Sequence, residues 1–335
     1  MQDHLGRGVK PAKPEAQLRT LLLATLPLFA LDQARLTRNA AGDVIEADFT
    51  STWISDADLD AVAAMPKLRA LRLGQTKIGD TGLERLRALR EVRELDLYYA
   101  EYITEDGLAH LRGWKQLEKL NLRGTRVTSK VFPHLGVLTG LRSLDVAFTQ
   151  VDDEGFEELL KLGELNHVAL GGNRLAGSCL AVLKSLPGLT SLDAGGTQRV
   201  DSGLWGLALN EQNLARIAGL KGLRRLSLAA ATINDRGIDK PGHPEAERAD
   251  LRDLSALKAL PALEQLDLSR QPVTAESIRS LRGMQALKEL RLGLAVKIDD
   301  AAVAELSALP SLRRVYVYGT AITPAGLAKL GGLVN

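Results

Sequence analysis

Three side-chain types that together perform nucleophilic catalysis recur in the middle of the chain. Asp145, His167 and Ser191 stand at intervals close to the 24-residue spacing of an internal repeat, and Asp193 follows. On neighbouring strands these side chains would come within ~5–7 Å of one another, which is the outline of a Ser–His–Asp triad. An open sheet offers no oxyanion hole and little exclusion of water, and a repeat places polar residues side by side by construction. The sequence therefore predicts no catalytic residue and a protein that is not an enzyme.

Cofactor and metal chemistry find no matching pattern either. The chain carries no GxGxxG, P-loop or HExxH motif, so no cofactor is predicted. Asp145 and Asp193 would lie a whole coil apart, ~10 Å, which is too far to share one ion. The single cysteine, Cys179, can form neither an internal disulfide nor a cysteine-rich zinc site. We predict no metal site and a buried structural thiol.

Composition excludes further classes of partner. The 43 basic and 41 acidic residues leave a net charge of +2, so nucleic acid is not a predicted partner. The apolar run Thr20–Leu31 is shorter than the ~20 residues that span a bilayer, so no membrane partner is predicted. The lone cysteine favours a cytoplasmic location. A secretory signal over Thr20–Ala30 is the alternative; otherwise the run caps the first repeat.

The elements that must position these residues come from a repeat. The pattern L-x-x-L-x-L begins at eleven places: Val44, Leu68, Val92, Leu117, Leu141, Leu165, Leu189, Leu223, Leu263, Leu287 and Leu312. Its alternation predicts a strand with one buried face. The full unit is L-x-x-L-x-L-x-x-T-x-I-[TD]-x-x-G-L-x-x-L-x-x-L-x-x, whose second half places apolar residues three apart, as on a short helix.

This unit resembles the leucine-rich repeat family over residues 44–335. It is similar to the ribonuclease-inhibitor-like and F-box-associated repeats and to bacterial proteins of the same period. The resemblance implies an α/β fold: a right-handed solenoid with a parallel sheet on the concave face and short helices on the convex face.

Two polar positions of the unit have a structural explanation. The ninth position is mostly threonine, whose hydroxyl can bond the backbone where the buried strand turns away. The twelfth position carries residues that cap helices, and in Thr323-Pro324 a proline follows at the first helical position.

The predicted organisation is a tail and capping segment over 1–43 and a repeat domain of about eleven coils over 44–335. Two long intervals predict insertions near 205–214 and 239–250, beside each other at the helix side or edge. The last coil ends without a polar closing element. We expect it to be covered by a partner or a second copy, or to be followed by further chain.

Residues between the leucines predict the functional surface. Aromatic side chains are rare in this chain, so five on one predicted face indicate recognition. Gly171, Gly172, Gly195 and Gly196 allow two interpretations: they ease the turn, or they form a trough for a partner. The predicted partner-binding residues are the aromatic anchors Tyr98, Tyr99, Phe148, Tyr316 and Tyr318 and the charged residues Asp96, Asp145, Asp193, Arg123, Arg225, Arg270 and Arg291.

The predicted function is a non-enzymatic scaffold that binds a protein partner, of unknown identity, on its concave face. Two alternatives stay open. One is an adaptor or effector module of the F-box-associated kind, although residues 1–40 show no F-box-like helical segment. The other is a structural protein that associates with itself through its last coil.

Overall fold

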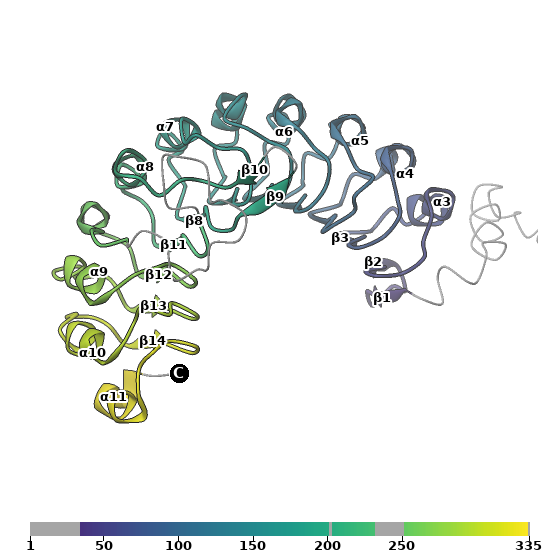
Figure 1. Cartoon of the computed structure of the whole chain (residues 1–335). Coiled ribbons are helices and arrows are strands. Elements are labelled where there is room, and N and C mark those ends of the chain that lie inside the picture. The colour runs from purple at the N-terminus through teal and green to yellow at the C-terminus, as the bar shows by residue number, and fades with distance from the viewer. Residues whose placement is uncertain (1–33, 201–202, 232–250, 334–335) are drawn as a thin grey trace, which may run out of the picture.

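The computed structural model describes residues 34–200, 203–231 and 251–333. They wind into an arc with the strands along its inner side and the helices along its outer side (Figure 1). Each coil supplies one strand, one turn and, in most coils, one short helix. The predicted α/β solenoid, with its sheet on the concave face, is confirmed.

One long sheet forms the inner wall. Its described strands pair in the order of the chain and are parallel, except that β1 is antiparallel to β2. The sheet contains β1 (Arg35–Arg38), β2 (Val44–Asp48), β3 (Ala70–Arg72), β4 (Glu94–Asp96), β5 (Lys119–Asn121), β6 (Ser143–Asp145), β7 (His167–Ala169), β8 (Ser191–Asp193), β11 (Arg225–Ser227), β12 (Gln265–Asp267), β13 (Glu289–Arg291) and β14 (Arg314–Tyr316).

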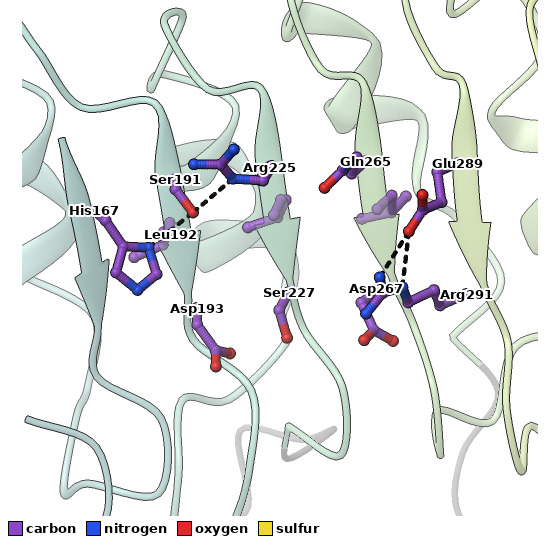
Figure 2. Close-up of a pocket in the computed structure, with 12 residues that line it drawn as sticks. His167, Ser191, Leu192, Asp193, Arg225, Ser227, Gln265, Asp267, Glu289 and Arg291 are labelled. Atoms are coloured by element: carbon purple, nitrogen blue, oxygen red, sulfur yellow. Dashed lines mark hydrogen bonds and ion pairs between the residues drawn. The ribbon is translucent and has the colours of Figure 1, made fainter. Parts of the chain in front are cut away.

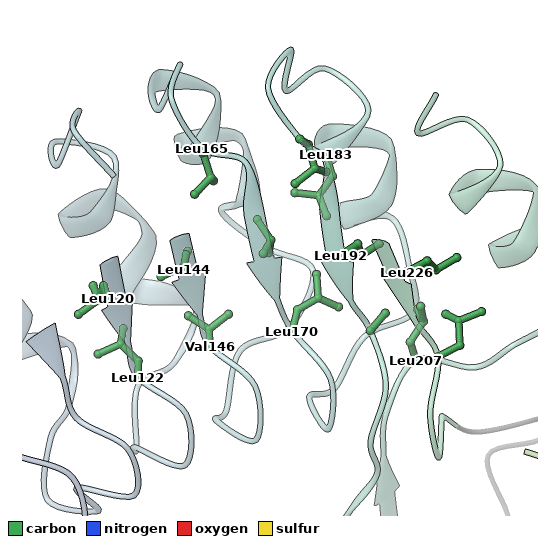
Figure 3. Close-up of a cluster of buried hydrophobic side chains, with 14 of the residues drawn as sticks. Leu120, Leu122, Leu144, Val146, Leu165, Leu170, Leu183, Leu192, Leu207 and Leu226 are labelled. Atoms are coloured by element: carbon green, nitrogen blue, oxygen red, sulfur yellow. The ribbon is translucent and has the colours of Figure 1, made fainter. Parts of the chain in front are cut away.

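The core lies between this sheet and the helices. Equivalent apolar residues pair in register from strand to strand, as Leu71 does with Leu95 and Leu95 with Leu120. Figure 3 shows the leucines of adjacent coils stacked into one continuous layer. Because these side chains are almost fully buried, replacing one by alanine would cost about 2–5 kcal/mol. The repeat spacing thus fixes which faces of each strand point outward.

In several coils the ninth-position side chain bonds the backbone of the turn after the strand, as the sequence predicts. The hydroxyls of Thr76 and Thr125 are buried and donate to the carbonyls of Leu73 and Leu122, each three residues back, at 2.7 and 2.6 Å. Asn173 takes the same place and donates to the carbonyls of two consecutive coils. The backbone groups freed by the turn are therefore satisfied inside the protein.

The outer layer consists of short α- and 3-10 helices. They are η1 (Asp56–Asp58), α3 (Leu59–Ala63), α4 (Asp80–Arg85), η2 (Leu86–Ala88), α5 (Glu105–Ala109), η3 (Ser129–Val131), α6 (Phe132–Leu135), η4 (Phe156–Lys161), α7 (Cys179–Leu183), α8 (Glu211–Ile217), η6 (Ser255–Ala259), α9 (Ala275–Ser280), α10 (Asp300–Ser307), α11 (Pro324–Leu330) and η7 (Gly331–Leu333).

Most twelfth-position residues cap these helices. Thr104, Thr128, Asp299 and Thr323 each accept from the backbone of the helix they precede. A second feature links neighbouring coils. The carboxylate of Asp80 accepts from both the backbone N–H and the hydroxyl of Thr104 in the next coil, at 2.8 and 2.7 Å. The capping residues are thereby tied from one coil to the next.

The long coil after β8 contains an antiparallel hairpin, β9 (Gln198–Val200) and β10 (Gly203–Trp205). Asn210 then caps α8, which takes the place of the repeat helix. The extra residues of this coil thus lie slightly earlier than the predicted range 205–214, because a capped helix resumes the repeat at Asn210. The insertion predicted near 239–250 and the apolar run Thr20–Leu31 lie outside the described residues.

Candidate functional site

Aspartates alternate along the fifth position of the repeat, the last residue of each strand. Asp48, Asp96, Asp145, Asp193 and Asp267 end β2, β4, β6, β8 and β12, which are every second strand in the sheet order. The strands between them end in Arg72, Asn121, Ala169 and Ser227. We call these five aspartates the aspartate row. Their carboxylates recur along the inner wall at two strand spacings, or about 9.6 Å.

Each carboxylate of the aspartate row also has a structural task. One oxygen accepts from the backbone N–H two residues later, as Asp145 does from Ala147 at 2.8 Å and Asp193 from Gly195 at 3.0 Å. Asn121 makes the same bond to the N–H of Arg123 without a charge. This turn explains why aspartate or asparagine suits the position, but it does not require a negative charge.

The environment of Asp145 disfavours the negative charge on its carboxylate. Burial raises the pKa of this carboxyl from 3.8 to about 6, although the Ala147 N–H and the Arg123 guanidinium oppose the rise and Asp193 adds to it. Burial likewise raises the pKa of Asp96, against the bond from the Tyr98 N–H. Carboxyls with perturbed pKa values occur at functional sites and in structural ion-pair networks alike.

The eighth position of every coil has a positive φ. The residues are Ser51, Gln75, Tyr99, Gly124, Phe148, Gly172, Gly196, Ala230, Arg270, Leu294 and Gly319. Glycine adopts this conformation without strain, whereas a large side chain is rare there. Tyr99 and Phe148 are therefore placed at a backbone cost that glycine avoids in other coils.

The glycines receive the rings of these aromatic residues. A methyl group on Gly124 would lie 2.7 Å from the Tyr99 ring, and one on Gly172 would lie 2.8 Å from the Phe148 ring. A methyl group on Gly171 would collide with the backbone of Gly195 in the next coil. Close contact between coils accounts for these glycines, so they give no support to a trough shaped for a partner.

The structure brings half of the predicted site together in the coils of β4, β5 and β6. Tyr98 and Tyr99 are 36% and 37% exposed, and their rings meet edge to face with centroids 4.7 Å apart. The Arg123 guanidinium lies 4.4 Å from the Phe148 ring centroid and 3.6 Å from the Asp145 carboxylate. We call Asp96, Tyr98, Tyr99, Arg123, Asp145 and Phe148 the aromatic cluster.

A hollow of about 260 Å³ lies further along the same face, across β7 to β13. Figure 2 shows the predicted residues Asp193, Arg225 and Arg291 among the side chains that line it. His167 Nδ1 lies 2.9 Å from the Ser191 hydroxyl, and the Arg225 Nε donates to that hydroxyl at 3.4 Å. Burial lowers the pKa of His167, with a further contribution from Arg225, so its ring is neutral at pH 7.

The contacts of His167 and Ser191 do not complete a triad. The carboxylates of Asp145 and Asp193 accept hydrogen bonds from backbone N–H groups in the turns after their own strands. Neither carboxylate is hydrogen-bonded to the His167 imidazole. Ser191 is buried beneath Arg225, and the backbone N–H groups of His167 and Ser191 donate to carbonyls of the preceding coils. The arrangement therefore lacks both an oriented base and free donors for an oxyanion at this point.

The predicted residues Arg270, Arg291, Tyr316 and Tyr318 lie toward the C-terminal end of the arc. The Arg291 guanidinium is 5.3 Å from the Tyr316 ring centroid and pairs with Glu289 at 2.8 Å. Tyr318 is 64% exposed, and Arg270 is exposed in the turn after β12. Eight strand spacings separate β4 from β14, roughly 38 Å along the sheet. The predicted anchors thus form two groups, one on β4 to β6 and one at the C-terminal end of the concave face.

Sequence reasoning missed two other exposed aromatic residues, which lie in the coils of β2 and β4. Trp53 is 77% exposed with the Lys77 ammonium 5.1 Å from its ring centroid, and Tyr102 is 55% exposed. Both lie in the turns after β2 and β4, beyond the L-x-x-L-x-L segment from which the face was predicted. The available signal was their position one or two residues after the ninth position of the unit, whose buried threonines we call the threonine ladder.

Other chemistry finds little support among the described residues. Cys179 is buried, and burial raises the pKa of its thiol further with the help of Asp153, so the thiol is inert. No group of three metal-ligating side chains occurs within residues 34–200, 203–231 and 251–333. None of the helices described above is long and apolar enough to cross a membrane.

Comparisons with known proteins agree with this architecture. The family described as Leucine Rich repeat matches residues 64–86 and 138–160. The solved structures include an internalin from Listeria monocytogenes with a TM-score of 0.53 and 16% sequence identity, covering 97% of this chain and 95% of that one. No curated protein sequence matches the chain. The fold is therefore a leucine-rich repeat solenoid, similar in architecture to an internalin.

Proposed function

We propose that this protein is a non-enzymatic scaffold whose concave face binds a protein partner. Leucine-rich repeat domains are in general protein-binding scaffolds, which supports binding but names no partner. The single observation that carries the proposal is the aromatic cluster. Tyr99 and Phe148 occupy a backbone conformation that favours glycine. Tyr98 and Tyr99 are exposed beside the aspartate row.

The aromatic cluster has the chemistry of an interface anchor. Tyrosine offers a large apolar ring with a polar tip, and arginine over an aromatic ring keeps its charge available to a partner. Asp96 and Asp145 add carboxylates whose raised pKa favours contact with a cation. Arg225, Arg270 and Arg291 extend the charged surface toward Tyr316 and Tyr318, as a second contact region for a long partner.

The test is affinity capture of partners from the native lysate with the wild-type chain and with Tyr98→Ala/Tyr99→Gly. Glycine is the natural residue at the equivalent position of the next coil, so the fold should be unchanged by circular dichroism. We expect the specific partner to be depleted at least tenfold, since interface tyrosines often contribute more than ~1.4 kcal/mol each. Lys130→Ala on η3 of the convex side is the control. If the double variant captured the partner as well as the wild-type chain does, the aromatic cluster would be excluded as the binding site.

Two finer proposals accompany this function. The threonine ladder supports the 24-residue subclass that resembles ribonuclease-inhibitor-like and F-box-associated repeats, and with it an adaptor role in the cytoplasm. Self-association through the last coil is the competing proposal, since Tyr318 and Leu327 are exposed there. Light scattering of the purified protein separates a dimer from a monomeric binder.

A further inference from the structure

The aspartate row has a spacing that selects a partner conformation. Its carboxylates stand on alternate strands, whose separation is about 9.6 Å at the backbone. The side chains point into a concave face, so their tips lie somewhat closer together than their backbones. A ligand that meets several of these carboxylates at once must present cations at a repeat just under that distance.

Regular backbone conformations differ in this repeat. A polyproline II segment has three residues per turn and rises about 3.1 Å per residue, so every third side chain faces the same way at about 9.3 Å. Alternate residues of an extended strand recur at about 6.7 Å. Residues seven apart on an α-helix recur at about 10.5 Å, which exceeds the spacing at the tips. The polyproline II repeat fits best.

The charge of the row is available to such a ligand. Among the described residues, Asp145 meets the Arg123 guanidinium at 3.6 Å, whereas no ion pair is formed by Asp193 or Asp267. The strands between the last three aspartates end in Ala169 and Ser227, which leave room beside the carboxylates. Charge complementarity therefore calls for lysine or arginine on the partner.

The hollow supplies a second, independent feature. A polyproline II backbone makes no internal hydrogen bonds, so its carbonyls need outside donors. Arg225 is exposed and Gln265 is half-buried on the neighbouring strand, and both line the hollow between Asp193 and Asp267. Both residues stand two positions before the ends of β11 and β12, on the same face as the aspartate row (Figure 2), so a ligand backbone bound along that row would run beside them.

From this geometry we infer that the concave face binds a basic polyproline II segment of a protein partner, lying across the strands with a cation at every third residue. The inference rests on the proposed function and names the class of partner. Cations would pair with Asp145, Asp193 and Asp267, while Arg225 and Gln265 bond the ligand carbonyls.

The probe is a fluorescent peptide with four Pro-Pro-Lys triplets, titrated by anisotropy at roughly 0.15 M salt, where screening acts beyond ~8 Å. Its comparison peptide has the same composition with lysine at alternate positions, and a third, helical peptide carries lysine seven residues apart. We expect the triplet peptide to bind about tenfold more tightly than either, because only it engages successive carboxylates together.

The matched variant is Asp145→Asn/Asp193→Asn, which keeps the turn bonds as Asn121 does and should weaken the triplet peptide about tenfold. Asp106→Asn/Glu157→Gln, on α5 and η4, changes the net charge equally and should leave binding unchanged. Equal affinity for all three peptides, tighter binding of the helix, or no effect of the aspartate variant would overturn the inference. If the peptides fail while the tyrosine variant still loses the native partner, the partner class is wrong and the proposed function stands.

Discussion

Asp145→Asn offers a direct test of the charge held on the concave face. The carboxyl has an ordinary pKa of 3.8 when unfolded and about 6 in the fold, chiefly because it is buried. The folded protein therefore binds this proton more tightly than the unfolded chain does. The unfolding free energy falls as the pH rises from about 4 through 6, and the cost of the charge is complete above that range.

The magnitude follows from the two pKa values. Their difference corresponds to about 3 kcal/mol, since each tenfold change in proton affinity is worth about 1.4 kcal/mol. The side chain is 24% exposed, so solvent screens only part of this cost. Asparagine removes the charge and retains the acceptor for the Ala147 N–H, as Asn121 does in the preceding coil. We expect Asp145→Asn to raise the unfolding free energy at pH 7.5 by about 1–3 kcal/mol.

The assay is urea unfolding followed by circular dichroism at pH 4.5, 5.5, 6.5 and 7.5, because guanidinium would screen the charges. The gain should shrink toward pH 4.5, where the wild-type carboxyl is protonated. Asp48→Asn is the control of opposite sign. Burial would raise the pKa of Asp48, but bonds from Thr50 and the charges of Arg72 and Arg35 outweigh it and lower the pKa. A gain for Asp145→Asn that is absent, or that does not vary with pH, would refute the reasoning.

Two further substitutions test how the coils hold together. Asn173→Ala should lower the unfolding free energy by about 2–4 kcal/mol, since the buried amide bonds backbone groups of two coils. The urea midpoint of the variant against wild type measures this loss, and an unchanged midpoint would contradict the structural role of the ninth position. Gly171→Ala should prevent normal stacking because its methyl group would collide with Gly195, whereas Gly163→Ala has open space around it and should be tolerated. Equal soluble yield and equal melting temperature of the two variants would rule out this role of Gly171.

The repeat made most of the fold predictable. Leucine spacing determines which side chains enter the core, and the buried threonine at the ninth position must bond the turning backbone, as Thr76 does. The hairpin of β9 and β10 was less accessible, because these residues carry no repeat pattern. Likewise, the link from Asp80 to Thr104 joins residues one coil apart, which local reasoning within a single repeat does not reveal.

The candidate site was predictable only in part. Sequence alternation placed Asp145 and Asp193 on the outward face, but it gave no sign that one oxygen of each carboxylate is bonded in a turn. Nor did it show that Tyr99 and Phe148 have a positive φ, as the eighth residue of all the other coils does. The geometry of stacking dictates φ at this position. The glycines invited a functional interpretation for the same reason: the neighbours that contact them are a full repeat away.

The alternation of the aspartate row has a consequence for how such a chain can change length. A single coil is the unit of stacking, but the aspartates of the aspartate row recur only on every second strand. Loss of the one coil that bears Ala169 would bring two carboxylates to adjacent strands, about 4.8 Å apart, where like charges repel. Deletion or duplication of coils in pairs between β2 and β12 would keep the aspartates on alternate strands.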